Sequence, residues 1–304
     1  MKLFQAITKI LVVGILLHAP IGLKAQTPIV GYNKRTILNG SDTIISIPLH
    51  QYPGLFATVS STSSESNGRV TVEFEITDPL TENELSGSHY VRIVSGPAEG
   101  RHFPIVSIGA STISIESNEE NQLSSGTKIQ IIPHWTLSNF FVDHRSEAVH
   151  NSGGKLPIQR KTEILFFDTT RDGIELAPDK IFFRTSEGWH QATSGYPAAG
   201  DVTIPPGSAF VIRHPSGEAD TTLILNSYVN TGIATASLKT SSSGQQDVPL
   251  GLPRPVPVKL DELNLSGATA FISSATTAAV DRADELMVFV ERELLCKIRR
   301  LLHD

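Results

Sequence analysis

The sequence contains a single cysteine, Cys296, among its 304 residues. A lone cysteine cannot form an intrachain disulfide, and no cysteine stands near residue 26 to carry a lipid. A chain of this length can bury a hydrophobic core large enough to fold without disulfides. We therefore expect a bacterial envelope or secreted protein that is held together by its core.

Charge of one sign is also scarce. The formal net charge is −6, and the charged residues form no acidic or basic block. A nucleic-acid partner would require a clustered basic face. The composition therefore argues against nucleic-acid binding, and no apolar run after residue 25 is long enough for a membrane-spanning helix.

An apolar run does open the chain, at residues 10–17. It is shorter than the roughly 20 apolar residues that cross a bilayer, and Pro20 prevents the helix from continuing beyond it. A small residue, Ala25, then stands at a suitable cleavage position. These features predict a secretory signal peptide over residues 1–25, cut after Ala25, and export to the periplasm, the outer surface or the medium. The alternative is an uncleaved membrane anchor.

Long amphipathic helical patterns are missing before residue 284, and short alternating patterns stand in their place. In residues 69–76 every second residue is apolar, from Val70 to Ile76, which places the apolar side chains on one face of a strand. Turn residues such as Ser95-Gly96-Pro97 separate the runs. The pattern predicts an all-β fold with two β-sandwich or barrel-like domains and a short C-terminal helix. The other predicted strands are 89–94, 111–116, 127–132, 163–167, 180–184, 209–214 and 221–225.

Composition also suggests where the domains divide. Residues 26–141 carry the first series of strands, with a polar loop at 60–68. Residues 142–160 are polar and poor in apolar residues, which predicts a linker. A second β domain is expected over 161–290, and its proline-rich segment 249–257 favours extended backbone that forms an edge strand or a strap.

The C-terminal end allows two interpretations. Residues 282–289 resemble residues 161–167, and each segment is expected to enter a short apolar strand. After Phe289 the chain becomes charged and helical in pattern. Residues 291–304 are either a genuine terminal helix with an apolar stripe or a frame-shifted tail that replaces a second copy of the earlier unit.

A series of short segments runs in order along the mature chain, at 28–32, 40–49, 90–100, 133–137, 187–189, 206–213 and 254–258. Together they resemble an uncharacterised exported paralogous family known from verrucomicrobial genomes. The resemblance implies export and a β-rich fold, and it implies no catalytic residue, cofactor or activity.

Metal binding has weak candidates. Asp168, Asp172 and Glu175 resemble part of a calcium loop, although an Asp-Gly turn explains the same residues. His134, His144 and His150 lack a spacing that would place them on one face, so solvated loop histidines are the simpler interpretation. We expect no metal and no cofactor.

Catalytic motifs are missing as well. The chain contains no Gly-x-Ser-x-Gly turn, and Cys296 stands among leucines as a small buried hydrophobe would. An exported hydrolase stays an alternative, because such sites are assembled in space from distant loops.

Carbohydrate binding is another alternative, since sugars stack on exposed aromatic rings. Trp135 and Trp189 are the candidate contacts, although an indole more often fills a core or an interface. The favoured hypothesis is a non-enzymatic, structural or adhesive protein of the cell surface, with polysaccharide or other envelope proteins as partners.

Overall fold

The computed structural model describes residues 29–288, apart from 66, 77–84, 86, 118–122, 169–172, 175–176, 237–245, 264, 266–270, 279–280 and 282. Strands dominate it, which confirms the predicted all-β class. The helical elements are short: α2 (Leu137–Phe140), η2 (Asp143–Ala148), η3 (Pro157–Gln159) and η4 (Leu260–Leu263). Within these described ranges, no helix has the length and apolar character needed to cross a bilayer.

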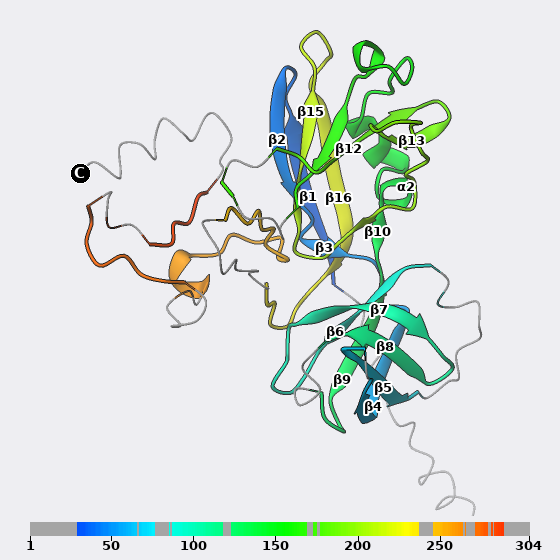
Figure 1. Cartoon of the computed structure of the whole chain (residues 1–304), viewed down its shortest axis with the longest axis vertical. Coiled ribbons are helices and arrows are strands. Elements are labelled where there is room, and N and C mark those ends of the chain that lie inside the picture. Colours follow the sequence, from blue (N-terminus) through cyan, green and yellow to red (C-terminus); the bar gives the residue numbers. More distant parts are fainter. Residues whose placement is uncertain are drawn as a thin grey trace, which may run out of the picture.

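One part of the fold is a closed barrel, drawn in the lower half of Figure 1. Its neighbouring strands all pair antiparallel, in the closed order β4-β5-β8-β7-β6-β9. Inward side chains such as Val72, Ile93 and Ile131 fill its interior, as alternation along each strand requires. The strands are β4 (Leu55–Ser64), β5 (Arg69–Glu75), β6 (His89–Ile93), β7 (His102–Ile108), β8 (Thr112–Glu116) and β9 (Lys128–Pro133).

The other part, here called the sandwich, combines residues 30–50 with residues 135–229 (Figure 1, upper half). A five-stranded sheet, β13-β12-β11-β15-β2, and a three-stranded sheet, β1-β16-β3, share one hydrophobic core. A short pair, β10 with β14, adds to it. The strands are β1 (Val30–Ile37), β2 (Ser41–Ser46), β3 (Leu49–His50), β10 (Trp135–Thr136), β11 (Glu163–Phe166), β12 (Lys180–Thr185), β13 (Gly188–Gln191), β14 (Thr203–Ile204), β15 (Ala209–His214) and β16 (Thr221–Val229).

The barrel is therefore an insertion into the sandwich. The chain leaves β3, enters the barrel, and returns through β10, and the side-chain amide of Gln51 donates a hydrogen bond to the carbonyl of His134 (2.7 Å) where the two crossings meet. This arrangement differs from the division expected at residue 141, because residues 30–50 pair with β15 and β16 and not with the barrel strands. Strand pairing between distant segments left no local pattern from which that boundary could be inferred.

The segment 142–160, expected as a linker, packs against the sandwich instead. Ala148 is fully buried in the core, and Arg145 is buried with its Nε donating to the carbonyl of Phe140 (2.5 Å). Arg184 on β12 donates from one Nη to the carbonyls of Ser146 (2.8 Å) and Val149 (3.2 Å). Arg184 thus gives backbone carbonyls of the segment their hydrogen-bond donors, so a segment with few apolar residues can pack against the core.

Three further expectations can be compared with the structure. The loop expected at 60–68 is partly strand, because β4 continues to Ser64. The strap 249–257 lies beside the β14–β15 turn, where the amide of Gly251 donates to the carbonyl of Gly207 (2.9 Å). Residues 283–288 form no strand, unlike the segment 163–166 that they resemble. The predicted signal peptide (1–25) and the C-terminal residues 291–304 lie outside the described residues.

Candidate functional site

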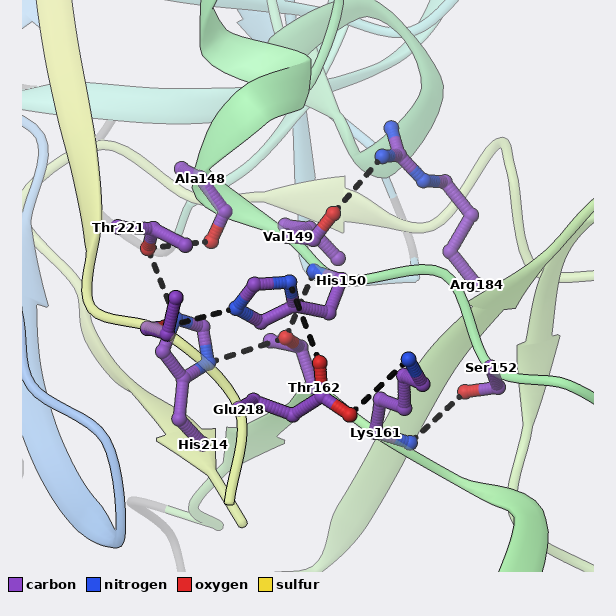
Figure 2. A network of polar contacts seen from close by, with 11 residues as sticks. Ala148, Val149, His150, Ser152, Lys161, Thr162, Arg184, His214, Glu218 and Thr221 are labelled. Atoms are coloured by element: carbon purple, nitrogen blue, oxygen red, sulfur yellow. Dashed lines mark hydrogen bonds and ion pairs between the residues drawn. The ribbon is translucent and has the colours of Figure 1, made fainter. Parts of the chain in front are cut away.

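A network of buried polar side chains joins several elements of the sandwich (Figure 2). His214 ends β15, Thr221 begins β16, Thr162 directly precedes β11, and His150 lies just after η2. His214 lies between the two threonines, with its Nδ1 3.0 Å from the Thr162 hydroxyl and its Nε2 2.8 Å from the Thr221 hydroxyl. The network brings together four segments that are far apart in the sequence.

The hydrogen bonds of this network fix the tautomer of His214. Thr221 donates its hydroxyl proton to the carbonyl of Ala148 (3.2 Å), so it accepts from Nε2–H of His214. Nδ1 of His214 then accepts from Thr162, whose oxygen also accepts the backbone N–H of His150 (2.9 Å). This chain requires a neutral imidazole, and burial, with the nearby His150, lowers the pKa of His214 accordingly.

The same geometry places the network out of reach of a substrate. Thr162 is 0 % exposed and His214 is 1 % exposed. At the rim, Glu218 lies 3.0 Å from Nζ of Lys161 and 3.7 Å from Nδ1 of His150, and Lys161 lowers the pKa of Glu218. We interpret the network as structural: its hydrogen bonds hold the 142–160 segment against the two sheets.

The two tryptophans predicted as ligand contacts are both packed within the protein. Trp189 is 5 % exposed and its ring centroid lies 5.2 Å from that of Phe141. Trp135 is half-buried, donates from its indole nitrogen to the carbonyl of Leu49 (3.2 Å), and lies 5.0 Å from the guanidinium of Arg145. Trp189 is therefore inaccessible to a sugar, and Arg145 lies over the Trp135 ring.

The structure describes only some of the predicted metal candidates. Asp172 and Glu175 lie outside the described residues, and Asp168 adjoins that gap. His134 is buried directly after β9 of the barrel, whereas His144 lies in η2 and His150 lies just after η2. In the described part of the chain, no three His, Cys, Asp or Glu side chains gather to hold a metal ion.

The open aromatic surface lies elsewhere, on the outer side of the three-stranded sheet. Tyr228 on β16 pairs with Val30 on β1 and with His50 on β3, so these residues share one side of the sheet. Tyr32 stands two residues after Val30 and faces the same way. The ring of Tyr52 lies 4.9 Å from that of Tyr228, and the ring of His50 stacks with Tyr228 at 6.4 Å.

We call Val30, Tyr32, Tyr52 and Tyr228 the tyrosine face. Three of its members are well exposed: Val30 by 62 %, Tyr32 by 63 % and Tyr52 by 54 %. The sequence contains a faint sign of it, since Val30 and Tyr32 alternate with polar or small residues. No sequence pattern relates these residues to Tyr228, because the pairing of β1 with β16 brings opposite ends of the sandwich together.

This chain matches no protein-family model, no curated protein and no solved structure.

Proposed function

We propose that this chain is an exported, non-enzymatic adhesive protein that binds uncharged polysaccharide through the tyrosine face. The observation that carries the proposal is the position of the aromatic rings. Three tyrosines gather on one side of a sheet with two of them more than half exposed, whereas the tryptophans are buried or half-buried. Exposed apolar side chains that gather on one side of a sheet are typical of an interaction site.

Tyrosine suits a sugar ligand for a physical reason. Its ring offers a flat apolar surface to the C–H face of a sugar ring, and its hydroxyl exchanges hydrogen bonds with sugar hydroxyls. With two side-chain torsions it loses little conformational entropy on binding. The four residues of the face carry no formal charge at neutral pH, which favours a neutral glycan over an acidic one.

Other features support the remaining parts of the proposal. The apolar run and small cleavage residue at the start of the chain favour export. The absence of catalytic motifs, and the burial of the Thr162–His214 pair, favour a non-enzymatic role.

The test is retention on insoluble polysaccharides, with cellulose and chitin as the first probes. Tyr32→Ala and Tyr52→Ala should each weaken retention about fivefold, since one stacked ring contributes about 1 kcal/mol. Substitution at such exposed positions changes stability by only about 0.5 kcal/mol, so lost binding would not reflect unfolding. The control is Ile158→Ala, which removes a side chain that is 93 % exposed and outside the face. Equal retention of the wild type and both tyrosine variants would refute the proposal.

A further inference from the structure

A small cavity lies where the barrel meets the sandwich. The barrel contributes Tyr90 and Arg92 from β6 and His102 from β7, and the sandwich contributes His50 and Trp135. Asn230 and residues 234–236, which come after β16, form a further wall. The volume is about 60 Å³, and a water molecule needs about 10–15 Å³, so the cavity holds a group of roughly four or five non-hydrogen atoms.

Arg92 is the unusual residue of this cavity. It is 8 % exposed, and its hydrogen bonds go to two neutral amide oxygens: Nη1 donates to Gln130 (3.4 Å) and Nη2 donates to Asn230. These bonds use two of the five N–H groups of a guanidinium, and the buried Nε has no hydrogen-bond partner. A buried charge with an unsatisfied donor costs free energy unless an anion compensates it.

The charge of Arg92 is not neutralised by a direct carboxylate partner among the hydrogen bonds described above. Burial lowers the pKa of Arg92, and Tyr90 and Glu99 act in the opposite direction. Glu99 is the nearby carboxylate, and it is half-buried. Arginine stays charged even so, because its ordinary pKa is above 12. The cavity therefore holds a guanidinium cation whose direct partners are amides.

The other polar residues of the cavity are neutral. Burial lowers the pKa of His50 and that of His102, and it raises the pKa of the Tyr90 hydroxyl, so at neutral pH all three are uncharged. Trp135 and a group of prolines supply apolar walls; the prolines are Pro48, Pro205, Pro206 and Pro253. The site thus combines the cationic guanidinium of Arg92 with neutral polar groups and an apolar surface.

We propose that this cavity binds a small aliphatic carboxylate, such as propionate, whose carboxylate pairs with Arg92 and whose short carbon chain lies against Trp135 and the prolines. The planar guanidinium matches the geometry of a carboxylate. A doubly charged phosphate would lose more hydration on entering these apolar walls, so it should bind more weakly. This site is separate from the tyrosine face and does not depend on the polysaccharide proposal.

The experiment is titration of the purified protein with sodium propionate at pH 7.5 and constant ionic strength, monitored by calorimetry and by the thermal unfolding midpoint. Propionate at saturating concentration should raise the midpoint by a few degrees, because ligand that binds only the folded state stabilises it. Propionamide, which has the same shape without the charge, and inorganic phosphate should produce much smaller shifts.

Two variants locate the effect. Arg92→Gln should weaken propionate binding by at least about tenfold, as expected for the loss of a charge-assisted hydrogen bond. Because Arg92→Gln could unfold the barrel, Asn230→Asp is the second variant: it places a carboxylate on Arg92, so the fold is retained while the added propionate is excluded. Arg69→Gln, at a half-buried arginine on β5, is the matched control and should bind as the wild type does.

Three results would overturn the proposal. The first is no shift with propionate in the wild type. The second is an equal shift with propionamide or with sodium chloride at the same ionic strength. The third is undiminished binding by Asn230→Asp.

Discussion

The barrel and the sandwich differ in how their strands pair and in which side chains fill their cores. The barrel closes one continuous stretch of chain, whereas the sandwich joins β1 to β16 and β2 to β15 across the whole insertion. The barrel interior is mostly branched aliphatic, and the sandwich core contains many large rings. The buried rings of the sandwich core are Phe140, Phe141, Phe182, Trp189 and Phe210.

This difference has a geometric cause. A six-stranded barrel has a narrow interior that valine and isoleucine fill, whereas the space between two sheets accommodates aromatic rings that touch both. The sandwich also includes a buried polar network, because its sheets are fastened to a long irregular segment whose backbone groups need partners. The comparison suggests that the barrel is autonomous and that the sandwich depends on distant pairing.

The largest expected effect comes from separating the two parts. A fragment of residues 51–134 should fold cooperatively, because the strand pairings of the barrel lie within it. A fragment that begins at residue 135 should not fold, because it lacks β1, β2 and β3. Far-ultraviolet circular dichroism and thermal melting of both fragments check this. An unfolded barrel fragment, or a cooperatively folded second fragment, would contradict the autonomy of the barrel.

A smaller loss of stability is expected at acidic pH, and it should depend on His134, which lies between β9 of the barrel and β10 of the sandwich. Burial, together with His102 and His89, lowers the pKa of His134 from the ordinary 6.5 to about 4. Between these values the unfolded chain binds more protons than the folded protein, so stability is complete above pH 6.5 and is lost as the pH falls towards 4. The loss attributable to this residue is at most about 3 kcal/mol.

His134→Phe keeps an aromatic ring beside Tyr90, whose ring lies 4.9 Å from that of His134, and removes the titration. Urea unfolding of the wild type and the variant at several pH values from about 4 to about 7 should show a shallower pH dependence in the variant. An identical dependence in both proteins would show that His134 is not the titrating group.

The smallest expected effect concerns the sandwich network. Thr162→Val keeps the shape of the side chain but leaves Nδ1 of His214 and the backbone N–H of His150 without their partner. The free energy of unfolding should fall by about 2 kcal/mol, the usual cost of burying unsatisfied polar groups. The control is Thr58→Val, at a half-buried threonine on the barrel strand β4, which should change stability by less than about 1 kcal/mol. Equal losses of unfolding free energy in both variants would show that the network does not stabilise the sandwich.

Much of the strand content was predictable from local patterns. The segments 69–76, 89–94 and 209–214 all become strands at nearly the expected bounds, because alternation of apolar and polar residues is a property of a few consecutive residues. The strands that were not predicted include β1, β2, β4 and β7, since exposed or mixed residues weaken their alternation. The packing of 142–160 was also missed, because arginine contacts rather than an apolar pattern hold that segment.

The candidate sites were less accessible to prediction. Composition pointed to the two tryptophans, yet the exposed rings include Tyr32 and Tyr52, because exposure depends on which face of a sheet is covered. Arg92 stands in a strand that is buried throughout, and nothing nearby in the sequence indicates that it reaches Asn230.

The sequence by itself therefore determined the all-β class, the absence of a disulfide, and the positions of the more regular strands. These properties depend on composition and on neighbours along the chain. The tertiary structure alone decided that the barrel is inserted between β3 and β10, that Tyr32 and Tyr228 share one face, and that Arg92 lies buried beside Asn230. Each of these depends on which distant strands pair, and many pairings are compatible with the same alternation of apolar and polar residues.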